Sequence, residues 1–152
     1  MFSKACEYGI RAAIYIAHQS KLQVRVGLKD ISREIDSPEA FTAKILQQLV
    51  KHDIITSVKG PAGGFEMNRE SIDQINLYHI VCAIDGDQIL QGCALGLKEC
   101  NPQHPCPVHH PFKVIRDQLK IMLETSSIVG LASEIKSGLS HLKLNPINDT
   151  PI

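Results

Sequence analysis

The chain has 152 residues, with 16 basic and 16 acidic side chains and therefore no formal net charge. This length allows one domain, or one small domain with an attached dimerising element. No apolar run approaches the length of a membrane span, so we expect no membrane partner. The charge is unevenly divided, because residues 1–70 carry a net +2 and residues 71–152 a net −2. The weak basic excess that would favour nucleic acid therefore lies in the N-terminal half.

The N-terminal sequence FSKACEYGIRAA lacks a signal-peptide pattern, because charged residues fall within its first turns. We therefore expect a cytoplasmic protein, in which thiols stay reduced. The five cysteines are an odd number. In a reducing compartment, this favours a metal-binding or redox role over a disulfide framework.

The first predicted element is a helix over residues 3–19, with one apolar stripe formed by Ile10, Ala13, Ile14 and Ala17. Glu7 and Arg11 lie four residues apart on the outer face of this helix. At that spacing the two side chains can form an exposed ion pair.

Two further helices are predicted over residues 28–35 and from about residue 38 to 51. Ser37 suits an N-cap and Pro38 the first helical position. Two helices joined by a tight turn are typical of a helix-turn-helix, whose second helix lies in the major groove. The alternative is an ordinary helical hairpin with a solvated face. Candidate DNA contacts on this stretch are Ser37, Glu39, Ala40, Phe41, Ala43, Lys44 and Gln47, and inward positions are Phe41, Ile45, Leu46, Leu49 and Val50.

A β-hairpin is predicted next, with strands over residues 54–58 and 65–67 and a glycine-rich turn between them. A hairpin directly after a helix-turn-helix is typical of a winged helix. The backbone N–H groups of such a tip can approach a phosphate or enter the minor groove. DNA binding is therefore favoured over a plain hairpin turn. The added candidate contacts are Ser57, Lys59, Gly60, Pro61, Gly63 and Arg69.

A helix over residues 76–85 precedes a loop over residues 86–110 that contains Cys93, Cys100, Cys106 and His109 in the spacing C-x6-C-x5-C-x2-H. Prolines and glycines break regular structure there. Long irregular loops in small domains usually have a function, and clustered thiols suggest that a bound metal orders this one. Idle surface cysteines are the alternative.

Two kinds of metal centre compete for this loop. Zinc would take the three cysteines and His109 as a closed tetrahedral set. An iron–sulfur cluster would take the three thiolates and one further ligand. Gaps of six and five residues are wide for zinc, so the spacing favours the cluster slightly.

A long amphipathic helix is predicted over residues 111–125, a last helix over residues 128–139, and a flexible tail over residues 140–152. A small winged domain has little apolar surface left for the long helix to cover. We therefore expect this helix to pack against a second copy of the chain. The alternative is that it folds back on its own domain.

The chain resembles the winged-helix iron–sulfur regulators of the IscR and NsrR type over residues 2–135. The resemblance rests on Tyr8 with the Ala-rich helix after it, the three loop cysteines, and the segments DIS (30–32), SVKGPAGGF (57–65) and IVCAIDG (80–86). It implies a homodimeric transcription factor that binds a pseudo-palindromic operator in double-stranded DNA. It also implies a [2Fe–2S] or [4Fe–4S] cluster on Cys93, Cys100 and Cys106.

The resemblance leaves the fourth ligand open. His109 matches the histidine of the IscR type, and Glu7 matches a first-helix carboxylate that the other subunit supplies in the NsrR type. Glu7 is favoured here. Three departures from the IscR pattern make the operator sequence impossible to transfer: the longer first cysteine gap, Ala43 in place of a glutamate, and Lys59 in place of the usual wing arginine.

The expected fold is mainly α with a small β-hairpin, namely a winged helix-turn-helix (residues 1–85), the cysteine loop (86–110) and a dimerisation region (111–139). The expected function is a DNA-binding regulator controlled by a cluster that senses nitric oxide, redox state or iron–sulfur status. The competing reading is a zinc-stabilised winged-helix protein without sensing. A thiol or metabolite sensor without a cluster is less favoured. No nucleophile–base pair suggests an enzyme.

Overall fold

Helix α1 (Lys4–Lys21) lies at the centre of the computed structural model, which describes residues 1–143. It contacts α3, α4 and α7, and the hairpin strand β2. Ser3 caps its N-terminus by accepting a hydrogen bond from the Cys6 N–H at 3.0 Å. The remaining elements are α2 (Leu28–Glu34), α3 (Glu39–Lys51), β1 (Thr56–Val58), β2 (Gly64–Glu66), η1 (Ile72–Gln74), α4 (Leu77–Asp85), α5 (Gln88–Gln91), α6 (His109–Thr125) and α7 (Ile128–Lys136).

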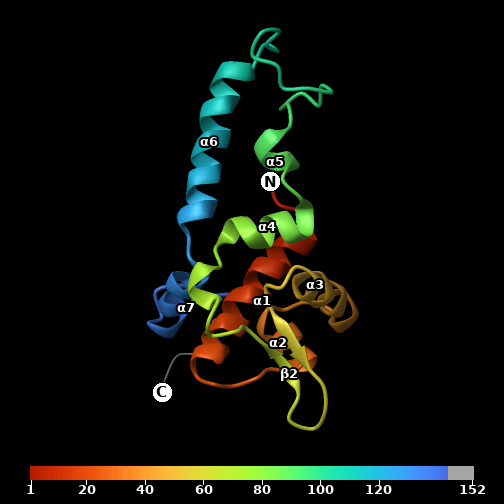
Figure 1. Cartoon of the computed structure of the whole chain (residues 1–152), viewed down its shortest axis with the longest axis vertical. Coiled ribbons are helices and arrows are strands. Elements are labelled where there is room, and N and C mark those ends of the chain that lie inside the picture. The colour runs from red at the N-terminus through yellow and green to blue at the C-terminus, as the bar shows by residue number, and fades with distance from the viewer. Residues whose placement is uncertain (144–152) are drawn as a thin grey trace, which may run out of the picture.

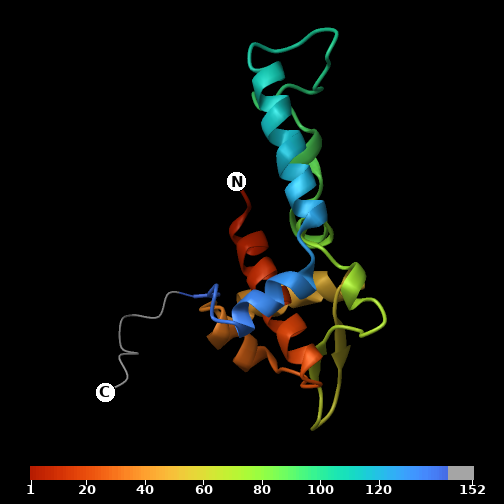
Figure 2. The ribbon, with the colours of Figure 1, turned by 90° about the vertical axis from the view of Figure 1, so that its left-hand side faces the viewer.

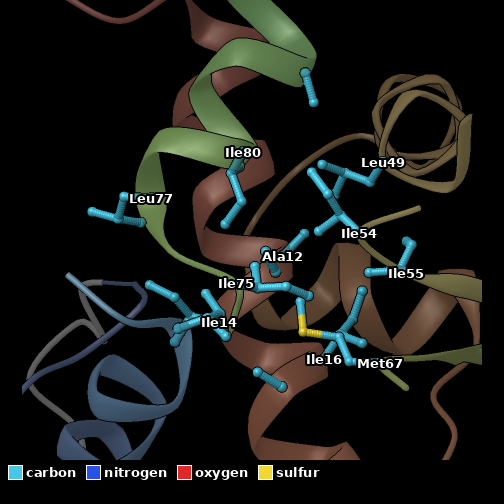
Figure 3. Packing of buried hydrophobic residues seen from close by; sticks show 14 of the residues in the cluster. Ala12, Ile14, Ile16, Leu49, Ile54, Ile55, Met67, Ile75, Leu77 and Ile80 are labelled. Carbon is cyan, nitrogen blue, oxygen red and sulfur yellow. The ribbon is translucent and has the colours of Figure 1, made fainter. Parts of the chain in front are cut away.

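The hydrophobic core surrounds α1 and is drawn in Figure 3. Small residues dominate the α1 contribution, so neighbouring helices approach closely. The labelled core side chains come from α1, α3, α4, the hairpin region and the segment before α4, and are Ala12, Ile14, Ile16, Leu49, Ile54, Ile55, Met67, Ile75, Leu77 and Ile80. One core therefore joins the helix-turn-helix, the hairpin and α4.

The helix-turn-helix consists of α2 and α3, and its turn passes through Asp36 in the left-handed region (φ 52°). The predicted serine N-cap is wrong, since Pro38 is the residue that precedes α3 and no side chain caps it. Ser37 instead lies 3.0 Å from the Thr42 hydroxyl. Thr42 is fully buried, so a polar residue occupies a core position that apolar periodicity alone could not identify.

The wing is an antiparallel pair of β1 and β2 in which Ser57 pairs with Phe65. A third segment joins its other edge. The Val26 N–H donates to the Phe65 carbonyl at 3.1 Å, and the Phe65 N–H donates to the Val26 carbonyl at 2.8 Å. The inner edge of the hairpin is thereby paired with the connection between α1 and α2.

Helix α6 extends away from this core, with α5 beside its middle and the cysteine loop at its far end (Figures 1 and 2). The hairpin lies at the opposite end of the long axis of the molecule in both views. Two details differ from expectation. The long helix begins at His109, within the predicted loop, and the short helix α5 interrupts that loop.

Helix α7 packs on α1 and ends at Lys136, three residues before the predicted end. The following residues return to the core: Leu142 is buried, and Arg11 donates to its carbonyl at 3.3 Å. The first residues of the predicted flexible tail therefore contact the core through Leu142, and residues 144–152 lie outside the described part of the chain. Among residues 1–143, no helix has the length and apolar character needed to span a membrane.

The fold makes Ile80 on α4 a sensitive position, because its side chain is 0% exposed in the core that joins α4 to α1. We expect Ile80→Ala to lower the free energy of unfolding by about 2–5 kcal/mol. Val24→Ala is the control, since that side chain is 46% exposed and its removal should cost less than about 0.5 kcal/mol. If urea denaturation showed that Ile80→Ala and Val24→Ala lower the free energy of unfolding equally, this packing would be contradicted.

Candidate DNA-binding surface and cysteine site

The outer face of α3 presents small and polar side chains. Ala40, Lys44 and Gln47 are exposed, and Ala43 is half-buried. Short side chains permit close approach to a groove, and the lysine supplies positive charge for a phosphate. Glu39 is also exposed at the start of the helix, where its carboxylate faces the positive end of the helix dipole.

Phe41 differs from the other candidates on α3, because it packs inward. Its ring meets Tyr8 of α1 edge-to-face, with centroids 5.7 Å apart. The Arg11 guanidinium in turn lies 4.5 Å from the Tyr8 ring centroid, within the range of a cation–π contact. Phe41 therefore fixes the first turn of α3 against α1 and leaves direct contact with a ligand to its neighbours.

The tip of the wing exposes Lys59, Gly60 and Pro61, and Arg69 is exposed beyond the second strand. Close backbone packing explains the glycine at position 63. A Cβ atom on Gly63 would lie 2.2 Å from the Val58 carbonyl oxygen. The predicted wing candidates therefore share one exposed end of the molecule, which also contains Ser57 on β1.

Arg25 is a further basic residue of this surface that the sequence reasoning missed. Its Nε lies 2.9 Å from the Glu66 carboxylate on β2, and its guanidinium donates to the Ala62 carbonyl in the tip at 3.5 Å. Arg25 therefore connects the base of the wing to its tip. In the sequence, Arg25 is recognisable only as a basic residue beside Val26. The pairing of Val26 with the hairpin was itself not predicted.

The structure brings Cys93, Cys100, Cys106 and His109 together as two pairs. The sulfur atoms of Cys93 and Cys106 lie 3.7 Å apart, and the Cys100 sulfur lies 3.4 Å from Nδ1 of His109. All three cysteines are half-buried, whereas His109 is only 5% exposed. Within residues 1–143, no three Cys, His, Asp or Glu side chains are close enough to share one metal ion.

Arg116 on α6 anchors the cysteine loop and was also missed by the sequence reasoning. Its guanidinium donates to the Gly92 carbonyl at 2.8 Å and to the Gln91 carbonyl at 3.3 Å, and it lies 3.4 Å from the Cys100 sulfur. No local pattern marks such a residue, because its partners are 16 to 25 positions away in the chain.

The surroundings of Cys93 and Cys6 shift the pKa values of the two thiols in opposite directions. The backbone N–H groups of Leu95 and Leu97 are the main cause that lowers the pKa of the Cys93 thiol. Burial raises the pKa of the Cys6 thiol on α1 to about 12. Of these two thiols, Cys93 is therefore the more reactive, and Cys6 stays a packed thiol.

Glu7 is separated from the cysteines of its own chain. It pairs with Lys4 at 2.9 Å on the first turns of α1, and this hydrogen bond lowers the pKa of its carboxyl. In Figures 1 and 2, the start of α1 lies below α5, whereas the cysteine loop lies above α5. Within one chain, the loop cysteines have His109 beside them and not Glu7.

Two glycines of the wing allow a matched test of its geometry. Both have positive φ, 103° at Gly60 and 139° at Gly64, but only at Gly64 would a Cβ meet a neighbour, the Val26 carbonyl oxygen at 2.8 Å. Gly60→Ala should therefore cost about 1–2 kcal/mol of backbone strain, and Gly64→Ala should cost more. Equal unfolding free energies of the two variants would show that the Val26 contact contributes nothing.

The Rrf2 family, described as iron-dependent transcriptional regulators, matches residues 2–134. A putative helix-turn-helix transcriptional regulator of Aquifex aeolicus is 29% identical over 133 residues, which cover 86% of this chain and 90% of that protein. The regulator IscR of Sodalis glossinidius is 26% identical over 127 residues, with 83% of this chain and 74% of IscR covered. Transcriptional regulators are not enzymes, which agrees with the expected class.

Solved structures support the fold. CymR, the global cysteine regulator of B. subtilis, has a TM-score of 0.72 at 22% identity and covers 88% of this chain and 96% of its own. IscR of T. potens has a TM-score of 0.66 at 16% identity, with 96% and 93% covered. The predicted winged-helix fold is thereby confirmed. Because the family match spans most of the sequence, the chain belongs to the Rrf2 family of transcriptional regulators.

Proposed function

We propose that this regulator is a homodimer whose operator binding is controlled by an iron–sulfur cluster held by Cys93, Cys100 and Cys106. The observation that carries the proposal is the arrangement of these thiols and His109 in two close pairs. A bound cluster would supply an iron centre that reacts with nitric oxide or oxygen and changes the local charge.

The pair distances match the chemistry of tetrahedral iron. Two ligands that bind one tetrahedral ion at about 2.3 Å through sulfur lie roughly 3.8 Å from each other. The Cys93–Cys106 separation is 3.7 Å, and the Cys100–His109 separation is 3.4 Å. A [2Fe–2S] cluster takes two protein ligands on each iron, whereas a [4Fe–4S] cluster takes one on each. The pairing therefore favours the [2Fe–2S] form.

The pairing also favours His109 as the fourth ligand, which reverses the order expected from the resemblance. His109 is buried and already lies beside the Cys100 sulfur. Glu7 would have to come from a second chain and exchange its partner Lys4 for iron. Glu7 from the partner subunit stays the alternative that substitution can test.

Coupling of the loop to the DNA-binding end would pass along α6. Arg116 fastens the start of the loop to α6 through the Gly92 carbonyl. At the other end of α6, the Asn76 side-chain amide donates to the Glu124 carbonyl at 3.0 Å, and Asn76 also caps α4. A change in the loop would thus reach α4, which packs on α3.

The DNA-reading surface would comprise the exposed face of α3 and the wing. Phosphate contacts would come from the basic side chains, and base contacts from the first turns of α3. Arg25 would position the wing through Glu66. The proposed contact residues are Ser37, Glu39, Ala40, Ala43, Lys44, Gln47, Ser57, Lys59, Gly60, Pro61, Gly63 and Arg69, with Phe41 as a positioning residue.

The exposed face of α6 supports the homodimer. Its inner face buries Leu123, but the opposite face exposes large apolar side chains to solvent: Val114 (57%), Ile115 (61%), Ile121 (60%) and Met122 (42%). Positions i, i+1, i+7 and i+8 form one stripe on a helix. A stripe of this kind is typical of a surface that a second copy covers.

Zinc is the second candidate, because both pair distances also match edges of a zinc tetrahedron. In that case the loop would be a structural element and the protein would regulate without cluster sensing. Zinc is colourless, so the absorption spectrum separates the two functions.

The test of the cluster is anaerobic purification followed by absorption and Mössbauer spectroscopy. We expect a coloured, iron-containing protein whose operator affinity at fixed salt differs from that of the metal-free protein by roughly 5–150-fold, the usual range of coupling between sites. Cys93→Ser, Cys100→Ser and Cys106→Ser should each lose iron.

Cys82→Ser is the matched control, because this thiol lies on α4 outside the loop. Loss of the spectrum in His109→Ala but not in Glu7→Ala would support His109 as the fourth ligand, and the reverse would support Glu7. A colourless, iron-free protein, or identical operator binding with and without the cluster, would refute the proposed function.

Substitutions in the exposed apolar stripe of α6 test the proposed dimer interface. We expect Ile115→Glu and Ile121→Glu to raise the dimer dissociation constant by at least about 100-fold, because burying an unpaired carboxylate costs several kcal/mol and each 1.4 kcal/mol is tenfold. Lys113→Gln on another face of the same helix should change it little. Sedimentation of an unaltered dimer in both glutamate variants would exclude this interface.

A further inference from the structure

Cys93 and Cys106 lie close together although they come from different parts of the loop. They are 13 positions apart in sequence, their sulfur atoms are separated by 3.7 Å, and both residues are half-buried. Small oxidants can therefore reach them, and neither is locked into the core. This geometry suits a reaction between the two thiols, in addition to the proposed binding of a cluster.

We propose that Cys93 and Cys106 form a reversible disulfide when the metal-free protein meets a small organic disulfide. In the first step, one loop thiolate attacks a sulfur of the small disulfide, forms a mixed disulfide and releases one small thiolate. In the second step, the other loop thiolate attacks the protein sulfur of that mixed disulfide and releases the second small thiol. The two protein thiols are oxidised by two electrons, and the small disulfide is reduced to two thiols.

The backbone around both cysteines is held in a suitable position. The Gly92 carbonyl, just before Cys93, accepts from Arg116 at 2.8 Å. The Cys106 carbonyl accepts from the His109 N–H at the start of α6 at 3.0 Å. A disulfide bond is about 2.05 Å long, so the sulfur atoms need to approach by roughly 1.7 Å. Rotation of these two half-buried side chains can supply much of that movement while α6 keeps both anchors.

The contacts of Cys100 explain why it is not the expected partner. Its sulfur lies 3.4 Å from His109 and 3.4 Å from Arg116, on the side of α6. Cys6 is fully buried on α1, far from the loop along the chain. Among the five cysteines, Cys93 and Cys106 are the pair that the described contacts bring together as two thiols.

The formation of the Cys93–Cys106 disulfide does not depend on the proposed cluster. Its effect on regulation does rest on that proposed function. Oxidation would remove Cys93 and Cys106 from the ligand set and leave Cys100 and His109. A regulator that had lost its cluster could then not regain it until a reductant opened the bond. The protein would thus have three states: loaded, empty with free thiols, and empty with a closed loop.

The test uses the full-length protein, made metal-free with a chelator under anaerobic conditions and then treated with oxidised glutathione. Peptide mapping without reductant measures which cysteines are linked. We expect the Cys93–Cys106 peptide pair to dominate in wild type and in Cys100→Ser, and to vanish in Cys93→Ser and Cys106→Ser. Cys82→Ser serves as the control and should keep the link.

A dominant link to Cys100, links between chains, or only mixed disulfides with glutathione would overturn the proposal. A second measurement adds iron and sulfide to the oxidised protein. We expect loss of iron uptake, with recovery after dithiothreitol, and full uptake by the oxidised protein would also overturn it. If the reduced wild type takes up no iron either, the proposed function fails while the mapped disulfide still stands.

Discussion

The close packing around α1 is the constraint on which the rest of the structure depends. Ala12, Ala13 and Ala17 are fully buried, and a Cβ atom on Gly9 would lie 2.1 Å from the end of the Ile84 side chain on α4. Small residues let α3, α4 and α7 approach one helix at the same time. The positions of the recognition helix, the wing and the base of α6 therefore share one reference element.

The cysteine-loop end and the wing end of the molecule are connected through few contacts. The cysteine loop and the hairpin lie at opposite ends of the long axis (Figure 1). Near the loop, the side chains of Arg116 and His109 join it to α6. At the base of α6, the Leu77 N–H donates to the Ser126 carbonyl at 3.1 Å, and the Ile128 N–H donates to the Ile75 carbonyl at 2.9 Å. The segment before α4 is therefore the point where the two ends meet.

Local patterns in the sequence predicted most helices and the wing, because apolar periodicity and turn residues are local signals. The long helix was predicted over residues 111–125, with Pro111 as its first residue. Proline is tolerated in the first turn of a helix, where its missing N–H is not needed, so α6 begins at His109 instead. The four-residue helix α5 is too short for a periodic pattern.

Long-range contacts explain what the sequence could not predict about the site. The cysteine spacing identified the four loop candidates, but it gave no indication that they lie in pairs. Arg25 and Arg116 act through partners on other elements, and no motif precedes them. Phe41 fits the inward apolar pattern, and its contact with Tyr8 shows that the pattern predicted its orientation correctly.

The way α6 stands out from the core has an evolutionary consequence. Its 17 residues span about 26 Å, and its attachment to the core is at the base, where Asn76 and its neighbours hold it. Substitutions near the tip can therefore accumulate without disturbing the packing around α1. In this sense α6 and the loop at its tip form a separable arm, whose outer half can change while the scaffold around α1 stays the same.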